Sequence, residues 1–170
     1  NRIWGFSSPV MAIDCSRGTR RGWIYIVFPA LNRSHPDIFL IRSTDGGATW
    51  SLPITVHQDA SGNDHWTPWI SADPATGRLY VVYYDSRNFP GNDFAQVYMS
   101  LSDDGGMTFR DTLISDTPFL PSGIGSNPVG MTPYNMGGYI GVAALRDSVW
   151  VCWNDNRTGI HQLYGSFFRN

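Results

Sequence analysis

The sequence predicts an all-β protein, and three observations support this. The 18 glycines and 11 prolines separate short runs rich in valine, isoleucine and aromatic residues, as many short strands joined by tight turns require. A stretch at 43–50, Ser-Thr-Asp-Gly-Gly-Ala-Thr-Trp, returns at 102–109 as Ser-Asp-Asp-Gly-Gly-Met-Thr-Phe. The segments around the two copies follow one another in the same order. With 42% hydrophobic and 15% charged residues, the 170-residue chain can bury a core.

Each copy of the repeated stretch is predicted to form a corner between two strands. Its serine and aspartate side chains can satisfy N–H groups of the turn, its glycines allow positive φ angles, and its aromatic ring can anchor the corner in a core. We therefore assign both copies a structural role. The corner residues are Ser43, Asp45, Gly47, Thr49, Trp50, Ser102, Asp104, Gly106, Thr108 and Phe109.

The first repeat, 9–56, is predicted to contain four strands. They are expected at 10–14, 22–28, 37–43 and 49–56, with a polar loop at 29–36. The strand at 22–28 is apolar on both faces, which indicates that layers cover it on both sides.

The second and third repeats restart this pattern. In the second repeat, 67–115, strands are expected at 68–73, 77–84, 95–102 and 108–115, with loops at 57–67 and 85–94. After a long connection at 116–137, the third repeat, 138–168, is expected to form strands at 138–144, 148–153 and 161–168. The third repeat ends before a third corner and a fourth strand.

Repeats of four antiparallel strands are typical of β-propeller blades rather than of a sandwich. A propeller closes with about four to eight blades, so two full blades and one three-stranded blade cannot close a ring. The sequence therefore predicts part of a propeller. We expect the remaining blades to come from the same longer protein, in preference to another chain.

Composition also limits the partners. The formal net charge of −2 provides no basic field for a phosphate backbone, so nucleic acid is not an expected partner. No apolar run reaches the roughly 18 residues of a membrane span. The chain starts at Asn1, and we expect that a leader or a longer N-terminal part has been removed. Cys15 and Cys152 are expected to be free, buried thiols, because adjacent equivalent repeats would not bring them together.

The two corners fit the pattern Ser-x-Asp-x-Gly-x-Thr-Trp/Phe, and the chain resembles the Asp-box (bacterial neuraminidase repeat) proteins of the sialidase-like superfamily. This resemblance implies a propeller that has six blades when complete. The segments 83–88 and 153–159, with 138–141, are similar to secreted bacterial members in particular. The resemblance therefore implies a secreted or cell-surface protein.

The resemblance also implies where function lies. In that family the Asp box lies between the third and fourth strands of a blade, away from the active site, and is not catalytic. Sialidases use three arginines for the substrate carboxylate, a tyrosine–glutamate nucleophile pair and an aspartate acid/base, of which this chain could hold at most some. Arg2-Ile3 is a weak match to the motif of the first arginine, but Trp4 stands where proline is expected, so the role is not transferred.

Strand alternation places the loops at the other end of the blades on one rim, where three polar clusters are expected. They are 32–35, then Asp64, His65 and Trp66 with Asp85 and Arg87, and finally Asp155 with Arg157. The arginines could bind a ligand carboxylate, Asp64 or Asp85 could act as acid or base, and Trp66 could stack on a sugar. The alternative is that each Asp-x-Arg is an internal salt link that holds a loop in place, and its repetition favours this alternative.

Metal sites receive less support from the sequence. His65 is expected to be a surface loop residue, and His35, His57 and His161 are scattered without metal-ligand spacing, so no zinc site is predicted. Calcium is the only cofactor considered, through Asp85, Asn88, Asn92 and Asp93, although these lack EF-hand spacing.

The predicted function is a propeller module that binds a carbohydrate or protein ligand on the face opposite the corners. The alternatives are an exo-glycosidase of sialidase type whose remaining catalytic residues lie outside this chain, and a structural surface or assembly component. The long connection at 116–137 could cover the propeller axis, line a pocket or meet a partner.

Overall fold

The computed structural model describes residues 8–32, 34–121, 139–146 and 148–169. These residues form three antiparallel sheets of four, four and three strands, which confirms the predicted all-β class. Arg2, Ile3, Arg33 and the connection from 122 to 138, all considered above, lie outside the described residues. No helix in the described part of the chain is long and apolar enough to cross a membrane.

Each sheet is a meander whose strands pair in chain order. Sheet 1 contains β1 (Val10–Ile13), β2 (Ile24–Asn32), β3 (His35–Ser43) and β4 (Ile54–Thr55). Sheet 2 contains β5 (His65–Ala72), β6 (Leu79–Asp85), β7 (Gln96–Ser102) and β8 (Arg110–Leu113). Sheet 3 contains β9 (Ile140–Leu145), β10 (Ser148–Asp155) and β11 (Gln162–Arg169).

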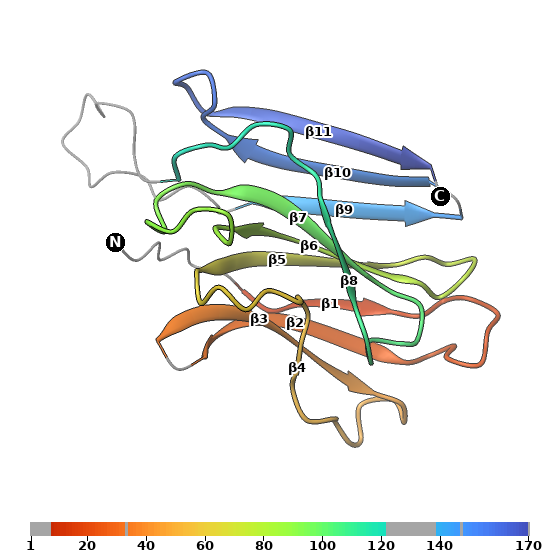
Figure 1. Cartoon of the computed structure of the whole chain (residues 1–170). Coiled ribbons are helices and arrows are strands. Elements are labelled where there is room, and N and C mark those ends of the chain that lie inside the picture. The colour runs from red at the N-terminus through yellow and green to blue at the C-terminus, as the bar shows by residue number, and fades with distance from the viewer. Residues whose placement is uncertain (1–7, 33, 122–138, 147, 170) are drawn as a thin grey trace.

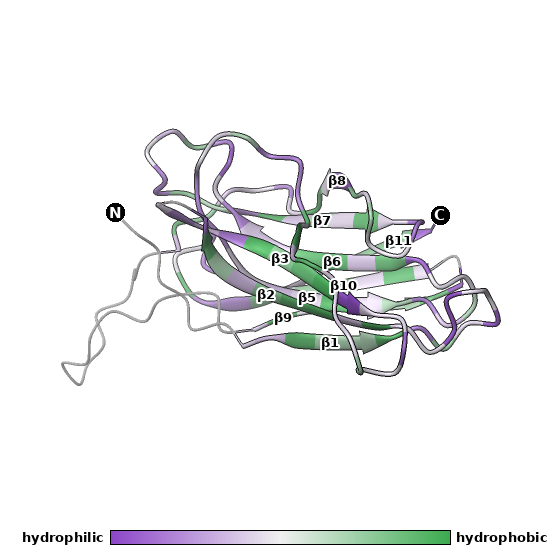
Figure 2. Ribbon diagram, turned by 90° about the horizontal axis from the view of Figure 1, so that it is seen from below, coloured by the Kyte–Doolittle hydropathy of each residue, from purple (hydrophilic) through white to green (hydrophobic). Residues whose placement is uncertain are grey.

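Sheet 2 lies between the other two sheets (Figure 1). Every residue of β6 is therefore buried, and its alternating side chains enter two different cores. Tyr80, Val82 and Tyr84 pack toward sheet 3, whereas Val81 and Tyr83 pack toward sheet 1. Hydrophobic residues follow the strands, and the loops at both ends are largely hydrophilic (Figure 2).

The outer sheets are covered on one face only by the described residues. In β10, Val149, Val151 and Trp153 are buried, but Trp150 is 47% exposed. The strand predicted at 22–28 to be covered on both faces belongs to sheet 1, and one of its faces is only half-buried in β2. This face and the outer face of sheet 3 are the two apolar surfaces on which further sheets could pack.

The two corners share one hydrogen-bond pattern. In the first, Ser43 Oγ accepts from the Gly47 amide at 2.8 Å, and Asp45 accepts from the amide and hydroxyl of Thr49 at 2.9 and 2.5 Å. In the second, Ser102, Asp104, Gly106 and Thr108 repeat these bonds. Both glycines of each corner have positive φ angles, from 74° to 95°.

The aromatic rings of the corners differ. Phe109 is buried, as predicted, but Trp50 is 41% exposed. The second corner packs against sheet 1, where the Arg42 guanidinium donates to the Gly105 carbonyl at 3.1 Å. No described segment covers the first corner in the same way, because sheet 1 has no described neighbour on that side.

Other local predictions were wrong. Most of the loop predicted at 29–36 belongs to β2 and β3, which pair as far as Asn32 and His35. The first strand of the second repeat begins at His65 rather than Pro68, because a bulge between Trp66 and Trp69 accommodates the proline and continues the ladder. Cys15 and Cys152 are free, as predicted, but both are exposed. Cys152 belongs to the outer face of sheet 3.

Candidate functional site

The candidate site lies at the end of the sheets opposite the corners. We call this end the rim; it carries the β2–β3, β6–β7 and β10–β11 hairpins, on the left-hand side of Figure 1. In each sheet, one pair of residues that face each other across neighbouring strands occupies the same level of the rim. The pairs are Ala30 with Asp37 in sheet 1, Asp85 with Gln96 in sheet 2, and Asp155 with Gln162 in sheet 3. Each sheet therefore places one carboxylate here, but only sheet 1 carries it on its third strand.

In sheet 2 the buried carboxylate of Asp85 is paired with Arg87. Arg87 Nε and Nη2 each lie 2.7 Å from Asp85 Oδ2, and Nη1 donates to Asp111 Oδ2 at 2.7 Å. The guanidinium carbon also lies 4.1 Å from the centroid of the Tyr98 ring. Burial opposes the charge of Arg87, but its contacts with Asp85 and Asp111 outweigh burial and raise its pKa.

Sheet 3 repeats this arrangement. Arg157 Nη2 donates to Asp155 Oδ2 at 2.6 Å, and the guanidinium carbon lies 4.1 Å from the centroid of the Tyr164 ring. Arg157 also pairs with Asp116, which follows β8 and so links sheet 3 to sheet 2. The side chains of Arg87 and Arg157 are 13% and 11% exposed. Both arginines are thus engaged within the protein, as the salt-link alternative describes.

In sheet 1 histidines surround the carboxylate of Asp37. His57 Nε2 donates to Asp37 Oδ1 at 3.0 Å, and His65 Nδ1 lies 3.1 Å from the same oxygen. The other oxygen, Oδ2, accepts from Asn32 Nδ2 at 2.6 Å and lies 3.4 Å from His35 Nε2. Asp37 is 2% exposed. Three imidazoles from separate segments therefore converge on one buried carboxylate.

The contacts of His57 define its tautomer. Its Nδ1 accepts a hydrogen bond from the Asp59 amide at 3.2 Å, so the ring proton that faces Asp37 is on Nε2. The ring also stacks on His65, with centroids 3.8 Å apart and planes inclined by 9°. Two imidazoles are thus held side by side above one carboxylate oxygen.

His65 lies among three carboxylates. Its Nδ1 faces Asp37, and its Nε2 lies 3.3 Å from Asp85 Oδ2 and 3.4 Å from Asp59 Oδ2. Neither ring nitrogen has a hydrogen bond of good alignment, so the contacts are mainly electrostatic. Burial opposes the imidazolium, but the contacts with Asp37 and Asp85 outweigh it and raise the pKa of His65 to about 9.

The charge of Asp37 is stabilised by the same cluster. Burial opposes its ionisation, but contacts with His57, His65 and Asn32 outweigh burial and hold its pKa well below the usual range. One oxygen of Asp37 and one nitrogen each of His57 and His65 lie within 4.8 Å of one another, and all three residues are buried. These are the described residues that could together hold a cation.

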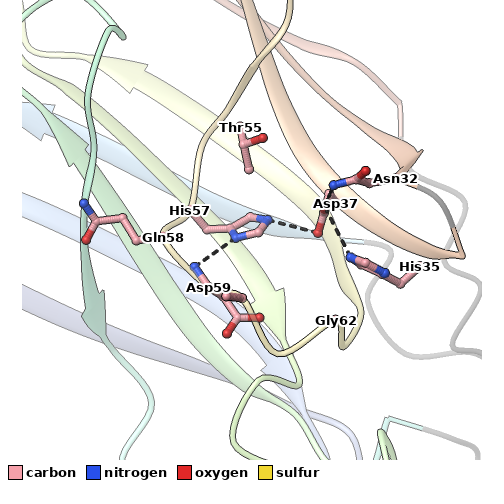
Figure 3. Close-up of a pocket in the computed structure, with 9 residues that line it drawn as sticks. Asn32, His35, Asp37, Thr55, His57, Gln58, Asp59 and Gly62 are labelled. Atoms are coloured by element: carbon pink, nitrogen blue, oxygen red, sulfur yellow. Dashed lines mark hydrogen bonds and ion pairs between the residues drawn. The ribbon is translucent and has the colours of Figure 1, made fainter.

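A cleft of about 580 Å³ opens beside this cluster (Figure 3). It is lined by Asn32, His35, Asp37, Thr55, His57, Gln58, Asp59, Ala60 and Gly62. Figure 3 shows His57 and His35 on either side of Asp37. The described lining residues offer amide, hydroxyl, imidazole and carboxylate groups, and none of them is an arginine or lysine. We call it the rim cleft.

Other predicted site residues have structural surroundings. Trp66 is 2% exposed and stacks on Tyr84 in the core between sheets 2 and 3, so it cannot stack on a sugar in this structure. Asp64 is 2% exposed; its carbonyl accepts from Ser86 and its amide donates to Asn92. His65 is 1% exposed, so the prediction of a surface histidine was wrong.

The four residues considered for calcium are used separately. Asp85 pairs with Arg87, and Asn88 Nδ2 donates to Tyr98 Oη at 2.7 Å. Asn92 Oδ1 accepts from the Asp64 amide, and Asp93 accepts from the Phe94 amide next to it in the chain. These contacts stabilise the β6–β7 loop.

The sequence analysis did not identify Asp37, His57 or Asp59 as site residues. Its prediction that the histidines are scattered was wrong, because His57 and His65 meet at Asp37. Aligning the repeats at their Asp-x-Arg motifs would have shown that the first repeat has Ala30 and Asn32 instead, with the acid moved to Asp37. The missing Asp-x-Arg motif in the first repeat could therefore have pointed to Asp37 from the sequence alone. The approach of His57 and His65 depends on the path of the segment between β4 and β5, which has no periodic pattern.

Comparison with known proteins shows the fold but not a family. No protein-family model matches the sequence. No curated protein matches it either. The structure is similar to that of an α-L-arabinofuranosidase from Fusarium graminearum, solved as a mutant with an iminosugar inhibitor, at a TM-score of 0.62 and 12% identity. The match covers 95% of this chain and 45% of that one, so this chain spans about half of the enzyme's length.

An N-acetylgalactosamine deacetylase from F. plautii, in complex with blood group B trisaccharide, matches at a TM-score of 0.48 and 14% identity. This match covers 96% of the chain and 49% of the deacetylase. The arabinofuranosidase match supports a propeller-like arrangement of the three sheets, and both named proteins act on or bind carbohydrates.

Proposed function

We propose that this chain is part of a sialidase-like β-propeller, with six blades when complete, that binds a neutral carbohydrate in the rim cleft. The observation that carries the proposal is the cleft itself, whose volume of about 580 Å³ lies within the usual range of small-ligand sites. Its Asn32, Thr55 and Gln58 side chains combine donors and acceptors, which suits sugar hydroxyl groups. The fold likeness to a carbohydrate-active enzyme supports the ligand class.

The charges of the cleft favour a neutral sugar over an acidic one. Asp37 and Asp59 both contribute to the lining, and none of the lining residues that the structure describes is an arginine or lysine. Arg87 and Arg157, which could have bound a carboxylate, are occupied by internal aspartates. Among the described residues, a sialic acid carboxylate would therefore meet negative charge without a matching guanidinium.

The exo-glycosidase alternative would need residues from outside the chain. All 14 acidic residues are aspartates, so the glutamate of a sialidase nucleophile pair would have to be supplied elsewhere. Binding is therefore the activity for which this chain's own residues provide a site. We further propose that the protein acts outside the cell, where polymeric glycans occur.

Further blades are the proposed partners of the outer faces. Met11 and Ile13 in sheet 1 are 60% and 46% exposed, and Trp150 and Phe167 in sheet 3 are each 47% exposed. Apolar strand faces of this kind are normally covered in a closed ring. Light scattering on the isolated chain should show self-association or aggregation that added detergent reverses, whereas a stable monomer would contradict further blades as partners.

Isothermal titration calorimetry against neutral and sialylated oligosaccharides tests the ligand proposal. We expect arabino-, xylo- or galacto-oligosaccharides to bind and sialyllactose not to bind. Gln58→Ala and Thr55→Val should each weaken binding about three- to tenfold, as expected for a lost hydrogen bond. Gln162→Ala, on the rim of sheet 3, is the matched control and should bind normally. Binding unchanged in both cleft variants, or confined to sialylated ligands, would refute the assignment.

A further inference from the structure

We propose that Asp37, His57 and His65 form a binding site for a divalent transition-metal ion of the zinc class, reached through the rim cleft. The proposal does not depend on the carbohydrate function. It rests on the position of three ligand atoms, on the groups that hold them, and on a buried histidine whose nitrogens lack aligned hydrogen-bond partners.

The three ligand atoms are Asp37 Oδ1, His57 Nε2 and His65 Nδ1. The carboxylate oxygen lies 3.0 Å from the first nitrogen and 3.1 Å from the second. Zinc–ligand bonds of about 2.0–2.2 Å give separations of roughly 3.3–3.5 Å between ligands in a tetrahedral site. A small outward movement of the side chains would therefore admit an ion between them.

Neighbouring residues hold two of the ligands as metal sites require. Asp37 Oδ2 accepts from Asn32, which leaves Oδ1 to face the histidines. The second nitrogen of His65, Nε2, lies 3.3 Å from Asp85 Oδ2 and 3.4 Å from Asp59 Oδ2. A carboxylate behind the distal nitrogen is the usual support of a metal-bound imidazole.

His65 supplies an independent observation. It is 1% exposed, yet neither ring nitrogen makes a hydrogen bond of good alignment. Buried polar groups are almost always satisfied, so an imidazole in this position is suited to a further partner. His65 Nδ1 and His57 Nε2 both face Asp37 Oδ1. The ion would lie between these three atoms.

Metal binding has three requirements. The first is that His65 releases the proton on Nδ1 to solvent, because only a neutral imidazole can bind the ion and the carboxylates around His65 favour the imidazolium. The His57 and His65 rings are stacked with their planes inclined by 9°, so one ring must tilt to direct both lone pairs at one ion. The proton on His57 Nε2 must move to Nδ1, which now accepts from the Asp59 amide. Binding therefore breaks the Asp59 contact and moves the segment that lines the cleft.

The ligand set determines the class of metal. Two imidazoles and one carboxylate suit zinc, cobalt or nickel, whereas calcium and magnesium prefer oxygen ligands. Asp37 and His57 also line the cleft, so the remaining coordination positions of the ion would face it. Three protein ligands with an open position are typical of sites where a metal contacts water or a ligand.

Cobalt(II) titration of the chelator-treated chain is the direct test. We expect about one Co²⁺ to bind per chain, with visible absorption bands of nitrogen and oxygen ligands, and Zn²⁺ to displace it. In ¹⁵N NMR, Zn²⁺ should shift the Asp59 amide and the ring nitrogens of His57 and His65. Absence of saturable binding, or binding that leaves these signals unchanged, would overturn the proposal.

Variants locate the ion. His57→Gln, at the edge of the cleft, should weaken Co²⁺ binding at least about tenfold. His161→Gln, at an exposed histidine in the loop between β10 and β11, is the matched control and should bind normally. Near-ultraviolet circular dichroism checks that each variant is folded. Equal affinity of His57→Gln and His161→Gln would place the ion elsewhere and refute this site.

Discussion

Asp85 in sheet 2 and Asp37 in sheet 1 are buried carboxylates at the same level of the rim, on the second strand of one sheet and the third strand of the other, and their partners differ. Asp85 pairs with Arg87, whose guanidinium stacks on Tyr98. Asp37 has imidazoles and an amide around it instead. Sheet 3 follows sheet 2, with Arg157 over Tyr164. Sheet 1 is therefore the exception among three related sheets.

This difference separates structural from functional chemistry. An arginine stays charged at all ordinary pH values and has no lone pair to offer, so the links in sheets 2 and 3 are permanent. A histidine can lose a proton and bind a metal or a ligand. Of the three carboxylates Asp37, Asp85 and Asp155, Asp37 is the one that lines the rim cleft as described. Repetition thus identifies the supporting links, and the departure from repetition identifies the candidate site.

The largest expected effect is the loss of the link in sheet 2. Arg87→Met keeps an apolar stem over Tyr98 but removes the charge beside Asp85, and we expect a loss of about 3 kcal/mol in the free energy of unfolding, measured with urea. Arg110→Met is the control, since Arg110 is 71% exposed in its pair with Asp103. That change should stay within about 0.5 kcal/mol.

The same two variants could contradict the structural role assigned to Arg87. If Arg87→Met were as stable as Arg110→Met, the guanidinium would not be needed for folding. Arg87 would then be available to a ligand, and the distinction between permanent links and a functional cluster would be lost.

The next largest effect is the pH dependence of sheet 1. His65 faces Asp37 on β3, Asp59 after β4 and Asp85 on β6, and it stacks on His57. Its pKa is raised to about 9, above the unfolded value of about 6.5, so the folded chain holds the proton more tightly. The contribution of this proton to the free energy of unfolding is therefore fully present below pH 6.5 and is lost as pH rises through 9.

Urea unfolding of the chelator-treated chain measures this loss. Between pH 6.5 and 9 the free energy of unfolding should fall by on the order of 2 kcal/mol. His65→Gln should flatten the curve over this range, whereas His161→Gln should leave it unchanged. A flat profile in the unaltered protein would show that His65 is not held as an imidazolium.

Much of the fold could be predicted from the sequence because its signals are local. Alternating apolar residues and the two Ser-x-Asp-Gly-Gly corners define most strands to within a few residues. The site depends instead on contacts between distant segments. Asp37, His57 and His65 meet because an irregular segment folds back across sheet 1, and neither periodicity nor ligand spacing records such a path. Trp66 was likewise misplaced by sequence reasoning. It was expected to be accessible to a sugar, but it precedes a bulge in β5 and its side chain is buried in the core.

The smallest change in stability is expected from transplanting the sheet 2 arrangement into sheet 1. Ala30, Asn32 and Asp37 occupy the positions of Asp85, Arg87 and Gln96, so the triple variant Ala30→Asp, Asn32→Arg, Asp37→Gln restores the common pattern. The platform for the new guanidinium already exists, because Phe39 lies two residues after Asp37 just as Tyr98 lies two residues after Gln96.

The triple variant should fold, and its free energy of unfolding at pH 7 should stay within about 1 kcal/mol of the original, because one buried carboxylate with a partner replaces another. Co²⁺ binding should be lost, since the oxygen ligand of the proposed site is gone, and the alkaline loss of stability should shrink because His65 no longer faces Asp37. Urea unfolding at pH 7 and 9 with Co²⁺ titration measures all three outcomes. If the variant kept both Co²⁺ binding and the pH dependence of unfolding, the presence of Asp37 in sheet 1 would not explain either property. Both would then have to come from Asp59 and Asp85.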